Sequence, residues 1–370
     1  MSHDRFMALA LALGRRAQGR TWPNPAVGCV LVRDGKIVGR GWTADGGRPH
    51  AETRALAQAG GKARGATAYV TLEPCSHHGK TPPCAQALID AGVAKVVAAI
   101  GDRDPRVNGA GFAMLRAAGI AVITGVRAEE ARQDHAGFFL RITEHRPFIT
   151  LKLANSFDGR IATASGESQW ITQAPARRAV HALRARHDAI MIGGGTARHD
   201  DPTLTVRDLG IAHQPVRLIL AKDLNLPDNS ALEQTLDIAP LWLCHSGGLS
   251  EKRRMHWQKM GAELIECRVQ DDEIVLSETL KDLASRGLTR ILCEGGGRLA
   301  ASLIKENLVD EIVGFQAGMI IGAEGQPAIG PMEIEHLQNA NRYELVTTTA
   351  VGPDVMNLWR RKDEKSSIIN

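Results

Sequence analysis

The sequence is poor in aromatic residues and in runs of like charge. Phe, Trp and Tyr make up only 4% of the 370 residues, and the net charge of +4 comes from lysines and arginines scattered along the chain. Proteins that bind nucleic acid usually carry a basic stripe, with aromatic side chains for stacking where they bind single strands. The composition therefore argues against a nucleic-acid partner and favours small phosphorylated ligands.

The sequence also has no apolar run of the length that a membrane-spanning helix needs, which is about 20 residues. The apolar stretch near the N-terminus covers only residues 6–13. Asp4 precedes it and two arginines follow it, so we interpret it as part of a first helix and not as a signal peptide. The six cysteines are dispersed, which argues against a disulfide framework. These absences predict a cytoplasmic protein without membrane association.

The length and the patterning predict two domains. The polar stretch ITEHRP (142–147) separates two periodic regions, so we expect domains over 1–145 and 146–360. The charged end of the chain, 361–370, is predicted to be a disordered tail. Both regions alternate helix and strand patterns, which is typical of the α/β class.

The predicted elements follow from hydrophobic periodicity and turn residues. In the first region we expect helices over 5–19, 51–59, 84–91 and 111–118, and strands over 27–32, 36–41, 66–72, 93–100 and 120–125. Asp34-Gly35, between the first two strands, predicts a hairpin turn. In the second region we expect strands over 148–153, 189–192, 216–220, 241–244, 290–293 and 311–315, and a helix over 298–307.

Two short motifs of the first region hold metal-binding side chains. His50-Ala51-Glu52 stands where a loop runs into a predicted helix, and Glu73-Pro74-Cys75 is followed by Cys84 after eight residues. Two thiolates and an imidazole suit Zn²⁺, and three protein ligands leave the fourth tetrahedral position to water. Zinc lowers the pKa of that water toward ~7, and Glu52 is close enough to carry protons to a leaving nitrogen. The pattern is typical of zinc deaminases, in which the glutamate is not a ligand.

Two other interpretations of these residues stay open. A lone cysteine is usually a small buried apolar residue, and a His-Ala-Glu triplet alone occurs by chance. A structural zinc site would be closed by four ligands, and His77 or His78 could supply the fourth. The presence of Glu52 together with Pro74-Cys75 favours catalytic zinc, because a structural site needs no such carboxylate.

Three segments of the first region carry a resemblance to a known family: 23–32 (PNPAVGCVLV), 49–53 (PHAET) and 71–84 (TLEPCSHHGKTPPC). They resemble the deaminase half of the bifunctional riboflavin-biosynthesis deaminase–reductases, which share the eight-residue interval between the cysteines. The resemblance implies a cytidine-deaminase-like α/β/α domain. It also implies that Asn24 and the backbone of Val27 and Gly28 line a pyrimidine site, and that His77 and Lys80 face the substrate.

Two glycine clusters of the second region each follow a predicted strand. Gly193-Gly194-Gly195-Thr196 follows the strand over 189–192, and Glu294-Gly295-Gly296-Gly297 lies between the strand over 290–293 and the last predicted helix. A strand, a glycine turn and a helix N-terminus bring backbone N–H groups close to a phosphate. Neither cluster is a G-x-G-x-x-G motif or a P-loop, so each alone is equally consistent with a tight connection.

The segments 151–172, 193–207 and 294–304 are similar to the reductase half of the same family. The resemblance implies a dihydrofolate-reductase-like α/β domain that uses NADPH. The NADPH contacts that it implies are Ala154, Trp170, Thr196, Asp200, Gly296, Gly297, Arg298, Leu299, Ala300, Ala301 and Ser302. The substrate contacts that it implies are Ser168, Arg184, Leu204, Arg207 and Glu294, with the arginines suited to a phosphate.

Several residues of the second region have alternative interpretations or depart from the family pattern. Lys152 and Asp200 are candidate contributors to hydride transfer, although such a lysine is as often part of a salt bridge, and Arg184 could be a helix-surface charge. Ala221-Lys222 stands where the family commonly has an acidic residue and a serine, which bears on a contact at the cofactor's edge. Gly318 stands where the family has a proline, which bears on the rigidity of a loop.

Together these features predict a bifunctional enzyme of the riboflavin pathway with one Zn²⁺ per chain and NADPH as cofactors. The first domain would deaminate 2,5-diamino-6-(5-phosphoribosylamino)pyrimidin-4(3H)-one. The second would reduce the ribosyl group of 5-amino-6-(5-phosphoribosylamino)uracil to ribityl. The rival hypotheses are a nucleic-acid or nucleotide base deaminase and a zinc-stabilised binding protein, each with a second domain that only senses nucleotide. We also expect a homo-oligomer, either a dimer or a tetramer.

Overall fold

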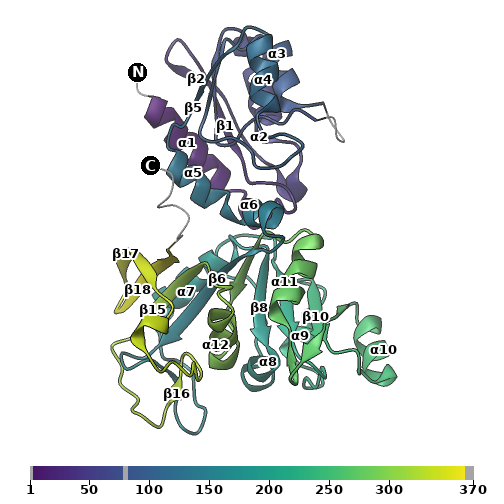
Figure 1. The fold of residues 1–370 in the computed structure, drawn as a ribbon, viewed down its shortest axis with the longest axis vertical. Coiled ribbons are helices and arrows are strands. Elements are labelled where there is room, and N and C mark those ends of the chain that lie inside the picture. Colours follow the sequence, from purple (N-terminus) through teal and green to yellow (C-terminus); the bar gives the residue numbers. More distant parts are fainter. Residues whose placement is uncertain (1–2, 78–81, 363–370) are drawn as a thin grey trace. The chain divides into compact units, whose positions relative to one another are not determined.

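The computed structural model describes residues 3–77 and 82–362 of the chain (Figure 1). As far as they are described, the residues form two compact units. Unit 1 comprises residues 1–147 together with 284–289, and unit 2 comprises residues 148–283 and 290–370. Within the described ranges, no helix is both long and apolar enough to cross a membrane.

Unit 1 is built around a five-stranded sheet with the strand order β2-β1-β3-β4-β5. The strands are β1 (Gly28–Arg33), β2 (Lys36–Trp42), β3 (Thr67–Val70), β4 (Lys95–Ala98) and β5 (Ala121–Thr124). β1 pairs antiparallel with β2 and β3, whereas β3, β4 and β5 run parallel. Asp34 and Gly35 both have positive φ, which confirms the predicted hairpin turn between β1 and β2.

Helices cover both faces of this sheet. They are α1 (His3–Arg15), α2 (Ala51–Ala59), α3 (Cys84–Asp90), α4 (Ala110–Ala117), α5 (Ala128–Asp134) and α6 (Ala136–Thr143). A Cβ on Gly28 would lie 1.9 Å from the carbonyl of Ala10 in α1, and a Cβ on Gly41 would lie 2.1 Å from the carbonyl of Ala51 in α2. Gly41 of β2 pairs with Cys29 of β1, so these two residues face the same side of the sheet. Gly28, the residue before Cys29, faces the other side, so α1 and α2 pack on opposite faces. Unit 1 therefore has the three-layer α/β/α architecture.

Unit 2 is built around a nine-stranded mixed sheet with the order β11-β10-β9-β8-β14-β6-β15-β18-β17. The strands are β6 (Phe148–Asn155), β8 (Ala189–Gly193), β9 (Val216–Leu220), β10 (Leu241–His245), β11 (Glu263–Glu266), β14 (Arg290–Cys293), β15 (Glu311–Gln316), β17 (Tyr343–Val351) and β18 (Asp354–Arg361). The strands from β11 to β15 run parallel, and β18 and β17 form an antiparallel hairpin at one edge.

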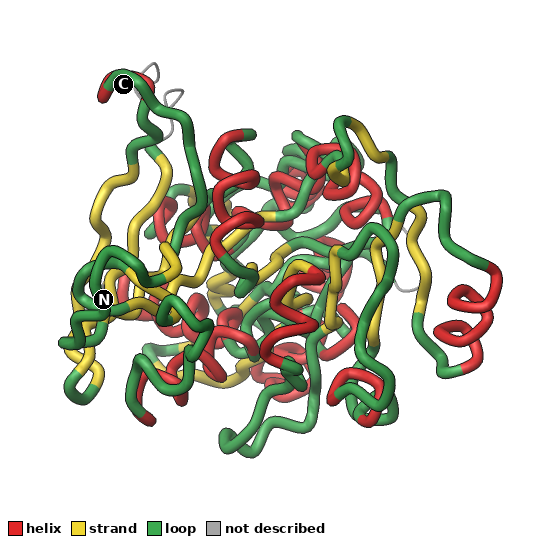
Figure 2. The backbone as a smooth tube through the Cα atoms, turned by 90° about the horizontal axis from the view of Figure 1, so that it is seen from below, coloured by secondary structure: helices red, strands yellow, loops and turns green. Residues whose placement is uncertain are grey.

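Helices connect the parallel strands of unit 2; Figure 2 colours the helices of the chain red and its strands yellow. They are α7 (Ala174–Arg184), α8 (Gly194–Asp200), α9 (Ala231–Gln234), α10 (Glu251–Lys259), α11 (Leu276–Ser285) and α12 (Gly297–Lys305). Two small antiparallel pairs complete the unit: β7 (Arg160–Ala162) with β16 (Gln326–Pro327), and β12 (Val269–Gln270) with β13 (Glu273–Ile274). One core cluster joins the strand residues Ile190, Ile219 and Leu243 to Leu232 and Trp257 from the helices.

The structure also differs from the predicted elements. The first helix ends at Arg15 and not at Gly19, and α5, α6 and the β17–β18 hairpin were not predicted. Gly194 begins α8 directly after β8, so the first glycine cluster starts a helix where we expected a turn. Arg361, which the sequence analysis places in the tail, is the last residue of β18 and pairs with Tyr343. Residues 363–370 lie outside the described part of the chain.

Candidate active sites

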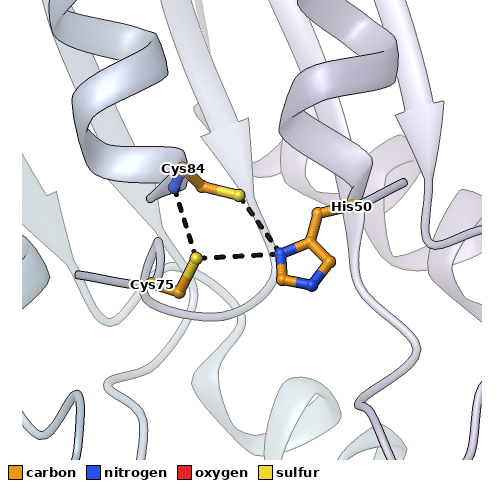
Figure 3. A group of neighbouring side chains, drawn as sticks. All are labelled: His50, Cys75 and Cys84. Atoms are coloured by element: carbon orange, nitrogen blue, oxygen red, sulfur yellow. Dashed lines mark hydrogen bonds between the residues drawn. The ribbon is translucent and has the colours of Figure 1, made fainter. Parts of the chain in front are cut away.

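The three predicted zinc ligands of unit 1 lie together. His50 directly precedes α2, Cys75 lies in the loop after β3, and Cys84 is the first residue of α3. The Nδ1 atom of His50 is 3.3 Å from the Sγ of Cys84 and 3.7 Å from the Sγ of Cys75 (Figure 3). The three ligand atoms lie within 4.8 Å of one another. The two helix starts and one loop thus bring a histidine and two cysteines to one point.

The chemistry of this group fits Zn²⁺. The backbone N–H of Cys84 donates to the Sγ of Cys75 at 3.2 Å. The hydrogen bond from the Cys84 thiol, and then the one from His50, lower the pKa of Cys75 to about 4, while the same bond between the two sulfurs, and then burial, raise the pKa of Cys84. The two thiols therefore share a proton that a metal cation can replace. Among the described residues the group contains no fourth donor, so a tetrahedral ion would keep one open position.

Glu52 lies on the first turn of α2 and is only 3% exposed. Burial, and next the neighbouring Cys75, raise the pKa of Glu52 to about 7. The residue is not a member of the ligand group. A buried carboxyl beside an open metal position is suited to carry protons during a hydrolytic reaction.

Glu73 is a further residue of this site that sequence reasoning did not single out. Its carboxylate is 3% exposed and accepts three backbone N–H groups, from Asp102 at 3.2 Å, Gly109 at 3.0 Å and Phe112 at 3.2 Å. Gly109 and Phe112 belong to the N-terminal end of α4, where N–H groups have no partner within the helix. Glu73 thus ties the start of the Cys75 loop to α4. The position of Glu73 directly before Pro74-Cys75 is the feature of the sequence that could have identified it as part of the site.

The residues expected to surround the pyrimidine have different environments. Asn24 packs against Gly47, where a Cβ would lie 2.1 Å from the Asn24 Nδ2 atom. The N–H groups of Val27 and Gly28 donate to the hydroxyls of Thr43 and Thr71, and their carbonyls accept the N–H groups of the same two threonines, so the backbone of both residues already has partners. His77 is partly buried, and within the described residues its Nδ1 atom has no hydrogen-bond partner. Lys80 and His78 lie outside the described residues.

The two glycine clusters of unit 2 form one corner. β8 and β14 are parallel neighbours, so their carboxyl ends lie side by side. The N–H of Gly296 donates to the Thr196 hydroxyl at 3.0 Å, and a Cβ on Gly295 would lie 3.1 Å from the backbone nitrogen of Gly193. A side chain at Gly295 would fill this corner. The two glycine clusters, each of which alone was weak evidence for a phosphate site, therefore meet at the N-terminus of α12, where backbone N–H groups are suited to a phosphate.

The expected NADPH contacts are distributed around this corner and along β6. Gly296, Gly297, Arg298 and Leu299 form the start of α12, whereas the side chains of Ala300 and Ala301 are buried and Ser302 donates to the Arg298 carbonyl. Ala154 lies in β6, and Asp200 is the last residue of α8. Trp170 is 60% exposed, and the Arg177 guanidinium lies 4.4 Å from its ring centre. The exposed ring is available for stacking.

Three of the polar candidates form a buried charge network. Glu294 pairs with Arg184 through two contacts of 2.6 and 3.1 Å, and Lys152 lies 3.8 Å from the same carboxylate. Burial alone would raise the pKa of Glu294, but Arg184 and then Lys152 lower it to about 2. Burial lowers the pKa of Lys152, against the attraction of Glu294 and of Asp200. Arg184 is therefore not a helix-surface charge, because its side chain is only 12% exposed.

The remaining substrate candidates lie outside this network. Ser168 is partly buried in the connection between β7 and α7. Leu204 is 2% exposed, so any ligand contact would involve its backbone. Arg207 is exposed and donates to the hydroxyls of Thr203 and Thr205.

Both departures from the family pattern have local partners. Lys222 forms an ion pair with Asp272 and donates to the Asp272 carbonyl at 3.1 Å. The loop that contains Gly318 is fastened by Asp158, whose carboxylate accepts the N–H groups of Ile321 at 3.2 Å and Gly322 at 2.7 Å. Hydrogen bonds thus hold the loop where the family has a proline.

The folds and the sites define a class of protein: a zinc-dependent deaminase domain followed in the same chain by an NADPH-type reductase domain. Residues 1–100 match the cytidine and deoxycytidylate deaminase zinc-binding region. Residues 147–357 match the RibD C-terminal domain. The rival hypothesis of a base deaminase with a nucleotide-sensing second domain is not favoured by these matches.

The chain belongs to the RibD family of bifunctional riboflavin-biosynthesis proteins. It is 40% identical over 356 residues to RibD of Aquifex aeolicus, which covers 96% of this chain and 98% of that protein. It is also 40% identical to RibD of Escherichia coli, with the same coverage. Among solved structures, RibD of Acinetobacter baumannii superposes with a TM-score of 0.88 at 34% identity, covering 98% of this chain and 99% of that one. The deaminase/reductase of Thermotoga maritima superposes with a TM-score of 0.85 at 32% identity, covering 97% and 99%.

Proposed function

We propose that the chain catalyses two successive steps of riboflavin synthesis. Unit 1 removes the 2-amino group of 2,5-diamino-6-(5-phosphoribosylamino)pyrimidin-4(3H)-one, and unit 2 reduces the ribosyl group of the resulting 5-amino-6-(5-phosphoribosylamino)uracil to a ribityl chain. The observation that carries the proposal is the buried Glu52 beside a three-ligand metal group, in one chain with a RibD reductase domain. When bound, zinc supplies an activated water and NADPH supplies a hydride.

In unit 1 the residues of the chain orient the pyrimidine and move a proton. We assign zinc binding to His50, Cys75 and Cys84, and the proton transfer to the carboxyl of Glu52. Glu52 is held on the first turn of α2 and excluded from water, so its carboxyl can pass the proton to the leaving amino nitrogen without competition from solvent. We assign Asn24, His77 and Lys80 to contacts with the substrate.

In unit 2 the corner at the start of α12 is the proposed site of the NADPH phosphates. The glycines let the two clusters approach closely, and N–H groups of a first helical turn, which have no partner within the helix, attract anions. We assign the exposed Trp170, with Ala154, Thr196 and Asp200, to further contacts with the cofactor.

The substrate phosphate is assigned to Arg207. Among the described residues, Arg207 makes no ion pair, and the hydroxyls of Thr203 and Thr205 orient its guanidinium. The charge of Arg184 is instead compensated by Glu294, and its Nη1 atom donates to the Thr205 carbonyl at 2.9 Å. Arg184 and Glu294 therefore shape the substrate site, with Ser168 and the backbone of Leu204 as neighbouring contacts. Lys152, which lies 3.8 Å from Glu294, is assigned to a contact with the sugar of the substrate.

A coupled assay tests the proposal. The pyrimidine spectrum and the NADPH absorbance are followed together after the diaminopyrimidine is added to the zinc-loaded full-length chain. We expect ammonia release with or without NADPH, and NADPH oxidation only after deamination has begun. NADPH oxidation by the diaminopyrimidine before any ammonia appears would contradict the order of the steps. Release of ammonia from cytosine in an oligonucleotide at a comparable rate would instead support a nucleic-acid deaminase.

We further propose that the chain acts in the cytoplasm as a homo-oligomer on small molecules and not on nucleic acid. The edge strand β17 supports self-association, because within the described part of the chain it pairs with β18 alone and exposes Leu345 and Val346 by 53% and 41%. Unpaired edge strands with apolar side chains are commonly covered in native proteins. Light scattering of the purified chain should give the mass of a dimer or a tetramer, and charged substitutions at Leu345 should reduce it.

A further inference from the structure

The segment 203–207 carries two of the proposed substrate contacts but belongs to no helix or strand. Leu204 and Val206 are 2% and 4% exposed, whereas Arg207 is exposed and donates to the hydroxyls of Thr203 and Thr205. Thr205, between Leu204 and Val206, is also buried, at 5%, so Arg207 is the one exposed side chain of the segment 203–207. Leu204 has a φ of 54°, a conformation that few L-residues adopt. The direction of Arg207 thus depends on one particular backbone conformation.

Side chains from outside the segment hold this backbone. The amide of Gln214 binds Val206 on both sides: its Oε1 accepts the Val206 N–H at 2.7 Å and its Nε2 donates to the Val206 carbonyl at 3.1 Å. The Nδ1 of His181 accepts the N–H of Arg207 at 3.2 Å. These three bonds supply partners that a neighbouring strand would otherwise provide.

His181 is placed for this purpose on α7. It lies three residues before Arg184, so both side chains emerge from the same face of the helix. Because the N–H of Arg207 is the donor, Nδ1 carries a lone pair and the ring proton is on Nε2. Burial, then the neighbouring Arg184 and Arg207, lower the pKa of His181, which keeps the ring neutral and able to accept.

We infer that His181 and Gln214 are positioning residues of the reductase, which hold the backbone of Val206 and Arg207 so that the Arg207 guanidinium faces the substrate phosphate before binding. The inference rests on the proposed assignment of that phosphate to Arg207. A preorganised cation lowers the ordering cost of binding. Loss of either positioning residue should therefore raise KM and leave kcat nearly unchanged.

The test compares two substrates of the full-length chain with saturating NADPH: 5-amino-6-(5-phosphoribosylamino)uracil and its dephosphorylated counterpart. We expect His181→Leu, which loses one hydrogen bond, to raise KM for the phosphorylated substrate about fivefold, and Gln214→Ala, which loses two, to raise it about tenfold. kcat should stay within about twofold, and kcat/KM for the dephosphorylated substrate should not change. His181→Asn is the matched control, because its side-chain oxygen can occupy the place of Nδ1 and should restore a KM near that of the parent.

A double-mutant cycle with Arg207→Ala completes the test. Arg207→Ala should raise KM for the phosphorylated substrate at least tenfold, since it removes a charged contact, and His181→Leu should add no further effect in that background. If His181→Leu raises KM equally in the presence and absence of Arg207, or equally for both substrates, the positioning role is overturned while the phosphate assignment stands. An unchanged KM in Arg207→Ala overturns the phosphate assignment together with the positioning role. Zinc-dependent ammonia release and the KM for NADPH show in each variant that both units are folded.

Discussion

The two sites of this chain are built from different interactions. In unit 1, an imidazole and two cysteine sulfurs surround a point that a cation can fill, and the nearby Glu52 is buried without an arginine or lysine partner among the described residues. In unit 2, Glu294 is already compensated by Arg184 and Lys152, and the anion-binding elements are backbone N–H groups and the exposed Arg207. The first site therefore needs a cation to balance the charge of its cysteine sulfurs, whereas the carboxylate of the second site is balanced by side chains of the chain itself. Changes at each site should affect one reaction and spare the other.

Removal of a zinc ligand gives the largest expected difference between the sites. Cys75→Ala should abolish ammonia release, because two remaining ligands cannot hold the ion at a useful affinity. NADPH oxidation with the deaminated substrate should continue at the parent rate. Zinc content by metal analysis and the two separate assays measure this. Loss of both reactions would show that zinc also maintains unit 2.

Glu52→Gln should lower the rate of deamination by about a thousandfold while zinc stays bound, since a positioned acid–base group contributes about 10²–10⁴ to a rate. The matched control is Glu129→Gln, the same chemical change on a carboxylate of α5 that is 72% exposed. Ammonia release and zinc content are compared in both. Near-normal deamination by Glu52→Gln would remove Glu52 from the mechanism.

Glu294→Gln tests the charge network of unit 2. It leaves Arg184 and Lys152 without their carboxylate, and breaking such a buried pair typically costs about 3–5 kcal/mol of the free energy of unfolding. We expect a loss of this order together with a large fall in reductase activity, with deamination retained. Glu278→Gln is the control, because its ion pair with Arg268 is exposed and should contribute less than about 1 kcal/mol. Denaturant unfolding that does not separate the two variants would contradict the network's role.

Gly111→Ala tests whether the close packing of α4 on the Cys75 loop supports zinc binding. A Cβ at this position would lie 2.0 Å from the carbonyl of Pro74, so the Cys75 loop must shift on α4. We expect zinc to be released to a chelator about tenfold more readily, in the range seen for groups that orient metal ligands. Gly61→Ala, where a Cβ meets no atom within 4 Å, should behave like the parent chain.

The stability of unit 2 should also depend on pH. Burial lowers the pKa of His187 to about 3, and its ring contacts the Leu183 carbonyl at 2.7 Å and the Thr150 hydroxyl at 2.9 Å. The unfolded chain binds the proton below about pH 6.5, but the folded chain does so only near pH 3. The stability of unit 2 should therefore be complete above pH 6.5 and fall as the pH drops toward 3. In His187→Gln this part of the pH dependence should be reduced, as denaturant titrations at several pH values can show.

The sequence predicted the zinc group better than the reductase site for a physical reason. His50, Cys75 and Cys84 have side chains whose chemistry identifies them, and two short motifs contain them. Glu73 was not recognised, because its function depends on three N–H groups that only the folded loop after β4 and the start of α4 bring to it. Most strands of both sheets were predicted from their apolar runs, whereas the exposed β17 has no buried face to produce such a pattern. The meeting of the two glycine clusters depends on β8 and β14 being neighbours, which no local pattern contains.

The distances along the chain between interacting residues bear on the order in which the sites form. His50 is 25 and 34 residues from its cysteine partners, whereas Arg184 and Glu294 are 110 residues apart. Contacts between residues close in sequence form faster, and N-terminal domains generally fold first during synthesis. Once the first hundred residues have left the ribosome, every zinc ligand is available. The charge network cannot form at this stage, because Glu294, which follows β14, has not yet been synthesised. Metal loading is therefore expected to precede assembly of the reductase on the growing chain.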